Sequence, residues 1–570
     1  MCEENGFMMN LLHMDAIDIN PSSSSSSLPS SSPTITVGAG ATVASILKEL
    51  SKHNLTLSNF SSIQEQQIAG WTQVAAHGTG ASLSTVDDMI LEMKMISPSL
   101  GPLTLSKTSL PHYFDYAKVG LGALGVVTEL TLQCIPKMTL KEETIVFPQH
   151  SKLSSSGHIQ RLKDYRHVRY MWIPWTETVV TVVSNPVEEA LIPSDSNLEV
   201  NGEEEKEKEK MNPLLELLFE RKPIFASSKS AFKDYSFSQL RDELLAIDPL
   251  NLALVQRINQ AEADYWTTLH GTSRVDDSTK ILGFDCGGQQ FVLEVCFNMG
   301  TLQKNEEKEM NGEATKDILF VQKLLQANFL LLFFFFFFLF FFFFFFFFFF
   351  FISFISFLFF FFFFLYFFLI IFFLLSSFFF FFFFFFFFFF FFFFFCLFFF
   401  LFFVFLLFLR FLNFPLRLIF FNFISSMQII KDNHLPAPGP IEQRWTAASS
   451  SFLSPAYSSN KEDIFCWVGI IMYLPSELTH EKRREVCRAF EKYVNLCLTL
   501  FEEEEAVPHW AKLEILNSSS FAEISRQERV LKQLRERYDL KGFAKVKKEL
   551  DPKGILSNEI VDVILGSVEQ

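Results

Sequence analysis

Apolar and polar positions follow two different periods in the first quarter of the chain. Residues 34–40, TITVGAG, alternate like a β-strand that ends at glycines, and residues 41–54 have the period of an amphipathic helix. The apolar face of this helix would consist of Val43, Ile46, Leu47 and Leu50. Further along, MILEMKMISP and GPLTLS predict a hairpin, and GALGVVTELTLQCIP predicts a long strand. The chain up to Pro148 therefore predicts an α+β domain with glycine-rich turns.

The pattern after residue 148 indicates a second, larger sheet. YMWIPWTETVVTVV, GGQQFVLEVCF and IFCWVGIIMYLP have the composition of buried strands. FSQLRDELLAIDPLN and THEKRREVCRAFEKYVNLCLTLF have the period of helices. From this pattern alone we predict a mixed sheet covered by helices on one side.

A block of residues 329–426 is almost pure Phe with some Leu, Ile and Ser, and it holds most of the chain's 79 Phe residues. An apolar run far longer than about 20 residues would ordinarily indicate membrane spans. Natural spans mix several apolar residue types and have interfacial aromatic residues and polar loops, which this block lacks. We interpret it as a translated intron inserted into the protein. The alternative is a membrane protein with a soluble head.

Charge and cysteine spacing exclude several kinds of partner. The net charge of −15 argues against a nucleic-acid partner, because phosphate binding needs clustered Lys and Arg. The chain's 8 cysteines show neither CxxC pairs nor metal-ligand spacing, so we expect no metal site and no disulfide framework. Residues 1–33 are an atypical low-complexity segment with a serine run, in which we find no transit peptide or secretory signal.

Two short motifs are candidates for chemistry. The loop QQIAGWTQVAAHGTGAS, residues 66–82, offers amide N–H groups and glycines of the kind that cradle phosphates, although an ordinary tight turn has the same composition. In IEQRW, Glu442 and Arg444 are two residues apart, so on a strand both side chains lie on one face. The carboxylate can accept hydrogen bonds from sugar hydroxyls and the guanidinium can stabilise an anion, whereas a surface ion pair is the alternative.

Several segments together resemble a known family, the aldonolactone oxidoreductases of the vanillyl-alcohol-oxidase type of flavoproteins. They are FSSIQEQQIAGWTQVAAHGTGAS, GLGALGVVTELTLQC, LLAIDPLN, ILGFDCGGQQ, PAPGPIEQRWTA, DIFCWVGIIMYLP, HWAKLEI and DPKGILSN. The resemblance runs from about Thr34 to the C-terminus, outside the Phe-rich block. It implies an α+β fold, with an FAD-binding domain of the vanillyl-alcohol-oxidase (PCMH) type at residues 34–148. A cap domain with a large antiparallel sheet and helices would follow at residues 149–328 and 427–570.

The resemblance also implies a reaction. The plant members oxidise L-galactono-1,4-lactone at C2, and the product enolises to ascorbate. FAD takes the hydride, and cytochrome c is the electron acceptor. The resemblance places such an enzyme at the mitochondrial inner membrane, facing the intermembrane space, with a second role in assembly of respiratory complex I. Two alternatives stay open: an oxidase of D-arabinono- or L-gulono-1,4-lactone that uses O2, and a non-catalytic remnant that serves complex I assembly.

The family's site residues map onto positions of this chain. The resemblance makes Glu442 and Arg444 the catalytic pair and Cys286 a thiol near the substrate whose oxidation inactivates the enzyme. It places the HGTG loop against the FAD pyrophosphate, where amides and missing side chains would allow a close approach. The positions implied to bind FAD are Ser61, Ser62, Gln66, Ile68, Gly70, His77, Gly78, Thr79, Gly80, Gly122, Gly125, Val126, His509 and Lys512.

The chain departs from the family pattern at two places. Ser61 stands where the dehydrogenases have an alanine that limits dioxygen access to the flavin. We expect this barrier to persist, with a serine hydroxyl near the flavin. Nothing upstream of Met9 resembles the family's first flavin loop, of the type VGSG-L-SPNG. The residues therefore do not decide between covalent and noncovalent FAD, and we expect an N-terminally truncated FAD domain that binds FAD more weakly.

Overall fold

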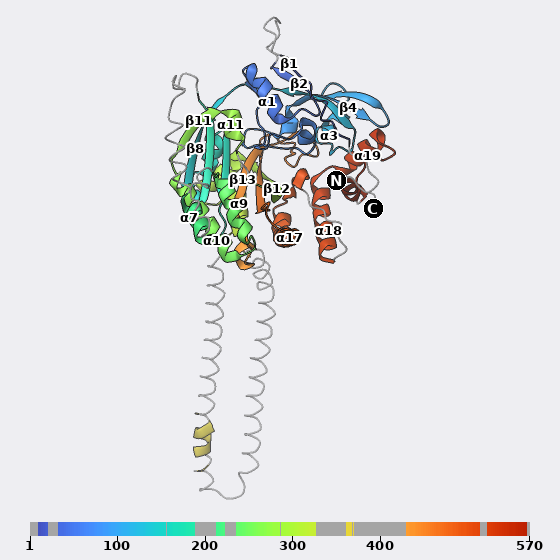
Figure 1. The fold of residues 1–570 in the computed structure, drawn as a ribbon. Helices are drawn as coiled ribbons and strands as arrows, with labels where there is room; N and C mark the ends of the chain where they lie inside the picture. Colours follow the sequence, from blue (N-terminus) through green and yellow to red (C-terminus); the bar gives the residue numbers. More distant parts are fainter. Residues whose placement is uncertain are drawn as a thin grey trace, which may run out of the picture. The chain divides into compact units, whose positions relative to one another are not determined.

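The structure is a computed structural model (Figure 1). It describes residues 9–20, 32–154, 157–187, 212–222, 235–284, 287–325, 359, 361–367, 369, 429–512 and 521–566. The chain divides into one unit made of Met1–Leu325 and Gln428–Gln570 and a second unit, Gln326–Met427. The second unit corresponds to the Phe-rich block, and most of it lies outside the described residues, so the interpretation as an insertion stays a prediction.

The predicted N-terminal α+β domain is built on a five-stranded antiparallel sheet of order β1-β2-β6-β4-β5. Its strands are β1 (Ile17–Asn20), β2 (Thr34–Gly38), β4 (Ile90–Ser97), β5 (Gly101–Ser106) and β6 (Val126–Gln133). Its helices are α1 (Val43–Lys52), α2 (Ile68–Gln73), the 3-10 turn η1 (Val86–Met89) and α3 (Pro111–Ala117), and a short ladder joins β3 (Leu55–Thr56) to β7 (Ile135–Pro136). The hairpin and the long strand expected from the pattern are confirmed.

Helix α1 forms where the apolar periodicity places it. Thr42 caps it by accepting a hydrogen bond from the Ser45 amide, which satisfies one of the free donors at a helix N-terminus. The four apolar residues of the predicted face are all buried, as expected for an amphipathic helix packed on a sheet.

The sheets extend across the boundaries predicted from the sequence. β1 pairs with β2, so the first sheet begins before residue 34, within the segment we expected to be atypical. β8 (Thr139–Phe147) belongs to the second sheet, which therefore begins before residue 149. The turn between the sheets follows β7, which ends at Pro136, where proline removes a backbone donor and ends the pairing.

The second sheet has eight strands in the order β11-β8-β10-β9-β13-β14-β12-β15. Every pairing between neighbours is antiparallel, so the mixed sheet predicted from the pattern is wrong and the antiparallel sheet implied by the resemblance is confirmed. The strands besides β8 are β9 (His167–Trp172), β10 (Val179–Pro186), β11 (Ser273–Asp277), β12 (Gln290–Thr301), β13 (Ile441–Ala447), β14 (Asp463–Tyr473) and β15 (Val507–Pro508).

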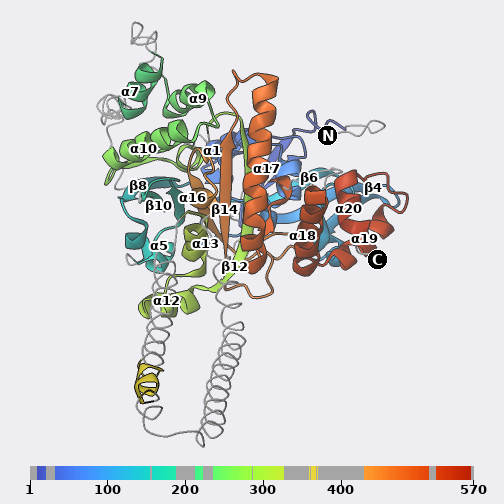
Figure 2. The same ribbon diagram turned by 90° about the horizontal axis from the view of Figure 1, so that it is seen from below.

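Helices pack against this sheet, and α17 (His480–Glu503) lies alongside β12 (Figure 2). The helix α13 (Lys316–Leu325) contacts both α17 and α16 (Ile429–Asp432). Further helices of this unit are α4 (His150–Ser154), α5 (His158–Asp164), α7 (Asn212–Arg221), α9 (Phe237–Ile247), α10 (Leu252–Thr268), α11 (Ser278–Leu282), α12 (Leu302–Met310), the 3-10 turn η4 (Trp510–Lys512), α18 (Phe521–Arg537), α19 (Leu540–Leu550) and α20 (Glu559–Gly566).

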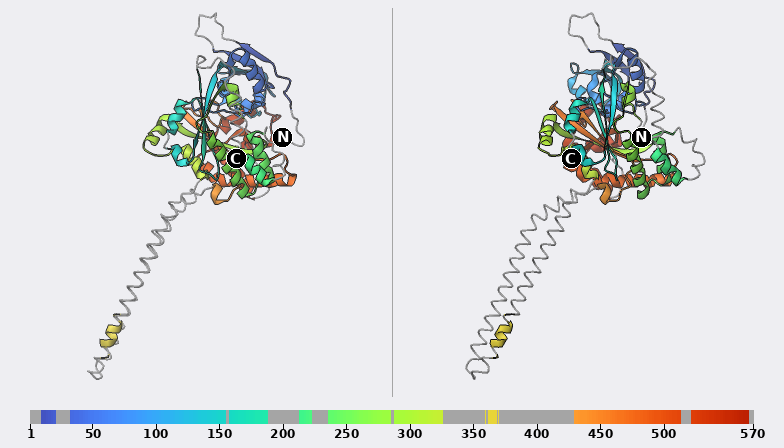
Figure 3. Two further views of the ribbon diagram at one scale, coloured as in Figure 1. Left: turned by 60° about the vertical axis from the view of Figure 1, so that its left-hand side comes forward. Right: turned by 90° about the vertical axis from the view of Figure 1, so that its left-hand side faces the viewer.

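The C-terminal helices return to the first sheet, as Figures 1 and 3 show for the red end of the chain beside the blue elements. The hydroxyl of Tyr116 in α3 donates to Asp539 at 2.5 Å, and Ser97 Oγ in β4 donates to the Leu550 carbonyl at 2.6 Å. The last part of the predicted cap domain is thus anchored on the FAD-binding domain. No helix among the residues described here has the length and apolarity required to cross a membrane. The same residues contain no group of side chains arranged to hold a metal ion.

Candidate active site

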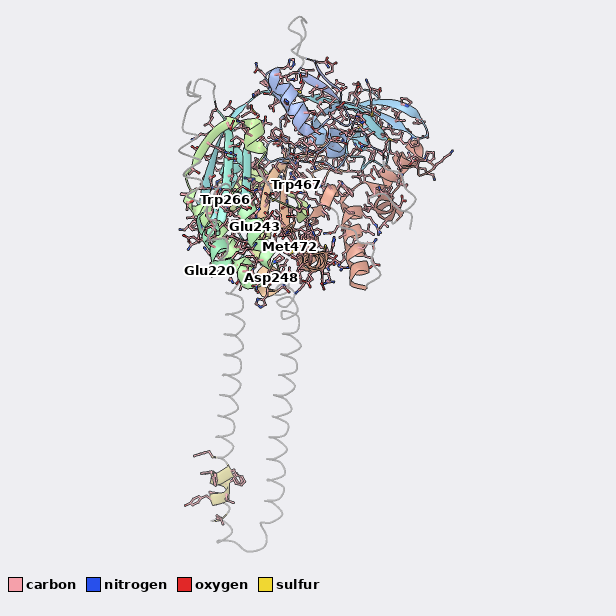
Figure 4. The ribbon with its side chains drawn as sticks, in the orientation of Figure 1. Glu220, Glu243, Asp248, Trp266, Trp467 and Met472 are labelled. Carbon is pink, nitrogen blue, oxygen red and sulfur yellow. The ribbon has the colours of Figure 1, made fainter. Side chains whose placement is uncertain are left out.

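The alternation of side chains along β13 separates a polar face from a packed face. Glu442, Arg444 and Thr446 lie on one face of the strand, and Gln443 and Trp445 lie on the other. The predicted pair therefore does share a face, although the ion pair between them is long, with Arg444 Nη2 3.9 Å from Glu442 Oε2. Figure 4 labels Trp467 in β14, the strand next to β13, and this residue is opposite Arg444 in the register.

The main partner of Arg444 is a residue that the motif did not indicate. Arg444 Nη2 lies 2.5 Å from Oε1 of Glu294, which comes from β12 on the far side of β14. The other oxygen of Glu294 lies 2.6 Å from Lys512 Nζ and 3.3 Å from His77 Nε2. Burial raises the pKa of Glu294, but Arg444, Lys512 and His77 outweigh it and hold the pKa well below its usual value. The cluster is a buried, ionised network.

Two histidines line this network and both stay neutral near pH 7. His77 stacks on Trp467 with ring centroids 3.8 Å apart, and His509 lies 5.7 Å from His77 by the same measure. Burial lowers the pKa of His77, and the negative charge of Glu294 offsets part of this decrease. Burial, together with the nearby Lys512, lowers the pKa of His509 well below its ordinary value. The predicted residues His77, His509 and Lys512 thus meet Arg444 at one place.

The HGTG loop docks on the edge of this site. The Gly80 amide donates to the Trp445 carbonyl at 2.6 Å, and the Thr79 hydroxyl donates to the Val168 carbonyl. A Cβ at Gly78 would overlap Asn59, and one at Gly80 would lie 2.5 Å from the Arg166 carbonyl oxygen. The missing side chains serve packing within the chain itself, and the expected contact of this loop with the FAD pyrophosphate stays a prediction.

Other positions implied to bind FAD divide into packed and open ones. Ile68 is completely buried and its amide donates to the Ala41 carbonyl, and a Cβ at Gly125 would overlap Met95. Gly70 in α2 and Gly122 are exposed, and a Cβ at either would have no atom within 4 Å. Gln66, Ser62 and Val126 are exposed or half-buried.

The residues around α2 fit an FAD group. The Gly122 amide faces Gln73 Oε1 at 3.3 Å, which places Gly122 beside the helix that carries Gly70. Nearby in sequence, Asn59 Nδ2 is a buried donor without a hydrogen-bond partner among the residues described here. Open space at glycines and a buried free donor are what a closely approaching cofactor requires.

Ser61 is committed to contacts within the chain. Its hydroxyl accepts a hydrogen bond from the Trp71 indole N–H at 2.8 Å and donates to the Ile63 carbonyl at 3.0 Å. We expected the Ser61 hydroxyl to lie near the flavin. In the structure its hydrogen atom and one of its lone pairs are engaged in hydrogen bonds within the chain. Cys286 lies outside the described residues, so its predicted redox role stays a prediction.

Glu294 and Arg169 are the functional candidates that the sequence reasoning missed. Glu294 interrupts the apolar run FVLEVCF, and a charged residue inside a buried strand is a signal, because it needs a buried partner. Arg169 in β9 is opposite Arg444 in the register and lies over the Phe284 ring at 3.5 Å. In its sequence context, HVRYMW, Arg169 is likewise a charged residue inside a buried strand.

The packed face of β13 carries a second buried network. Asp317 Oδ2 accepts hydrogen bonds from Trp445 Nε1 at 2.8 Å and lies 2.9 Å from His158 Nε2. Burial raises the pKa of Asp317, but His158 and several hydrogen bonds reverse this and lower it. Gln443 Nε2 donates to the Asp317 carbonyl at 3.0 Å. These hydrogen bonds fix the face of β13 opposite Arg444, and they thereby fix the position of the strand that carries Arg444.

Comparisons with known proteins agree with this architecture. The family model described as FAD binding domain matches residues 1–101, and the one described as D-arabinono-1,4-lactone oxidase matches residues 423–564. L-galactono-1,4-lactone dehydrogenase 2, mitochondrial, of Oryza sativa subsp. japonica is 34% identical over 92% of this chain and 70% of its own length. The mitochondrial enzyme of Arabidopsis thaliana is 32% identical over 93% and 68%.

More distant proteins share part of the sequence or the fold alone. L-gulonolactone oxidase of Bos taurus is 30% identical over 26% of this chain and 33% of its own length. The crystal structure of cholesterol oxidase from B. sterolicum aligns with a TM-score of 0.54 and 12% identity, over 98% of this chain and 84% of that one. The chain belongs to the FAD-dependent aldonolactone oxidoreductase family that includes the plant L-galactono-1,4-lactone dehydrogenases.

Proposed function

We propose that this protein oxidises L-galactono-1,4-lactone at C2 to a ketone that enolises to ascorbate. The observation that carries the proposal is the meeting of three segments that lie far apart in the chain: Glu442 and Arg444 of β13, Lys512 of η4, and the HGTG loop. When bound, FAD supplies the hydride acceptor, and the protein supplies placement and electrostatics.

Each polar group has a distinct task in this proposal. Glu442 is half-buried, so its carboxylate is accessible to accept hydrogen bonds from lactone hydroxyls. Arg444 and Lys512 are cations that stabilise negative charge developing on the lactone enolate or the reduced cofactor, an effect that is strong where water is excluded. His77 and His509 are buried and neutral, so they pack around the active site without adding charge to it.

We propose cytochrome c as the electron acceptor, in mitochondria at the inner membrane facing the intermembrane space. The relatives above carry mitochondrial names, which supports the organelle, and the retained side chain at Ser61 supports restricted access of dioxygen. An additional role in respiratory complex I assembly belongs to the same proposal. Purified enzyme given lactone should reduce cytochrome c while consuming little O2. Reoxidation in air as fast as that of a flavin oxidase would overturn the choice of acceptor.

A lactone oxidase that uses O2 is the second candidate, favoured by the match of residues 423–564 to the arabinono-lactone oxidase family model. Initial rates with L-galactono-, L-gulono- and D-arabinono-1,4-lactone, each with cytochrome c or O2, separate the two. We expect L-galactono-1,4-lactone with cytochrome c to give the highest kcat/KM. A protein that binds FAD and turns over none of the three lactones would leave only the non-catalytic role.

A further inference from the structure

The carboxylate of Glu294 contacts three of the basic side chains of the site. Its two oxygens are within 2.5 to 3.3 Å of Arg444, Lys512 and His77, and the residue is 1% exposed. Its main chain belongs to the same site, because the Glu294 carbonyl accepts the His509 amide at 2.8 Å. A charge this deeply buried is stable only when its partners compensate for lost hydration.

The path from Arg444 to Glu294 crosses an intervening strand. β14 lies between β13 and β12, and in the register Gly469 stands directly between Glu442 and Glu294. The guanidinium must therefore pass over β14, and Gly469 is the position there that presents no side chain.

Nothing in the local packing requires a glycine at 469. It lies inside a strand, its backbone is not in the left-handed region, and an added Cβ would come no closer than 3.9 Å to Glu442 and 4.0 Å to Glu294. Glycine inside a strand weakens it and often marks a close approach by another group. Here Gly469 leaves open space over β14 beside Glu442 and Glu294, and Arg444 reaches Glu294 from the neighbouring strand.

We propose that Glu294 is a positioning residue of this active site, which holds the Arg444 guanidinium across β14 and the Lys512 ammonium beside it. It thereby sets the separation and direction of the two cations that act on the lactone and the cofactor. This inference rests on the proposed function, and it adds one carboxylate to the machinery. Glu294 itself takes no part in bond making, because its oxygens are occupied by the two cations.

The direct test replaces Glu294 by glutamine in the FAD-loaded enzyme. Glu294→Gln keeps the shape and removes the charge, so Arg444 and Lys512 lose their common partner. Because a displacement of about 1 Å at a catalytic group costs about 100-fold in rate, we expect kcat to fall about 100-fold with KM changed less than about threefold.

The matched control is Glu262→Gln, since Glu262 is also 1% exposed and pairs with an arginine, Arg241, at 3.6 Å. The control should retain kcat within about threefold. Equal losses in both variants, or a normal kcat in Glu294→Gln, would overturn the proposal.

A second pair of variants leaves Glu294 in place. Gly469→Ala should keep kcat within about threefold, because its methyl group meets only ordinary van der Waals contacts. Gly469→Val adds bulk beside the Glu294 carboxylate, whose Oε1 would lie 4.0 Å from the new Cβ, and should lower kcat about as much as Glu294→Gln. A double variant that combines Gly469→Val with Glu294→Gln should be no slower than either single one, since residues that act as a unit are not additive. A Gly469→Val enzyme of normal kcat would contradict the proposed path.

A readout without lactone separates this inference from the proposed function. Glu294 has a pKa well below its unfolded value, so its stabilising effect is present above about pH 4.3 and is lost as pH falls further. The difference in melting temperature between the wild type and Glu294→Gln should be constant from pH 7 to 5 and shrink below pH 4. A difference that does not change with pH would refute the ionised cluster. Absence of lactone turnover in the wild type, with this pH effect intact, would instead refute only the proposed function.

Discussion

The chemistry of the site depends on which cation each carboxylate holds. The sequence motif pairs Glu442 with Arg444, but the structure places Arg444 Nη2 closer to Glu294, at 2.5 Å against 3.9 Å. Glu442 is consequently less tightly engaged and remains the carboxylate accessible to a hydroxylated substrate. This division of roles follows from the register of three strands, which a spacing of two residues within one strand does not reveal.

Arg444→Lys tests the geometry of that arginine rather than its charge. A lysine keeps the charge but lacks the planar guanidinium whose Nη2 lies nearest to both Glu294 and Glu442. We therefore expect kcat/KM to fall about 100-fold, within the range for loss of one charge-stabilising donor. The same substitution at Arg274, which pairs with Glu142 at 2.8 Å on the surface, should leave kcat/KM unchanged. Steady-state kinetics with lactone measure both, and an Arg444→Lys enzyme of normal kcat/KM would contradict the assigned role.

Ser61 tests the barrier to dioxygen. Ser61→Gly removes the side chain and its hydrogen bonds to Trp71 and Ile63. We expect faster reoxidation of the reduced enzyme by air, roughly tenfold or more if one extra methylene-sized opening admits dioxygen, with little effect on reduction by lactone. Stopped-flow mixing of reduced enzyme with aerated buffer measures the rate. Unchanged reoxidation would show that Ser61 does not line the route to the flavin.

His167 links stability to pH at the place where the HGTG loop meets the large sheet. Its ring lies 2.7 Å from the Thr79 carbonyl, and burial lowers its pKa to about 4. Below about pH 6.5 the unfolded chain binds a proton that the folded protein does not, so stability falls with pH until about pH 4. At pH 5 the loss from this residue is about 2 kcal/mol. Denaturant titrations should show that His167→Gln loses less stability than the wild type between pH 7 and 5, and an equal loss in both proteins would contradict this role of His167.

At the level of helices and strands, the apolar periodicity correctly predicted those elements whose formation depends on the local sequence. Helix α1, the β4–β5 hairpin and helix α17 are found where the apolar pattern places them, because burial of one face is a local property of the sequence. The mixed sheet was wrong because strand direction depends on which distant strands pair, and β9, β13, β14 and β12 come from separate parts of the chain. The contribution of Glu294 was missed for the same reason.

Helix α2 offers a test that separates folding from cofactor binding. Gly70 lies inside this helix with open space around it, so Gly70→Ala should stabilise the protein without FAD by up to about 1 kcal/mol through helix propensity. The same methyl group would intrude on the space we assign to FAD, so the FAD dissociation constant should rise. Denaturant unfolding without cofactor and fluorescence titration with FAD measure the two effects. A more stable variant with unchanged FAD affinity would remove Gly70 from the cofactor site.

At the scale of the whole molecule, the enzyme unit is formed by segments on both sides of residues 326–427. Helices α13 and α16, which precede and follow that segment, contact each other, so a short connection closes the gap at little entropic cost. A variant with residues 326–427 replaced by a short Gly/Ser linker should fold, bind FAD and keep its kcat. Size-exclusion chromatography and flavin absorbance measure this, and a linker variant that fails to fold would contradict the interpretation of the block as an insertion.

We propose that Glu442, Arg444 and Lys512 face an FAD that a sugar lactone reduces. Anaerobic stopped-flow mixing of the FAD-loaded protein with L-galactono-1,4-lactone tests it most directly, by following the absorbance of the oxidised flavin. We expect this absorbance to be lost rapidly, ascorbate to form in equal amount, and both events to be slower in Arg444→Lys. A flavin that stays oxidised in the presence of the lactone would contradict it.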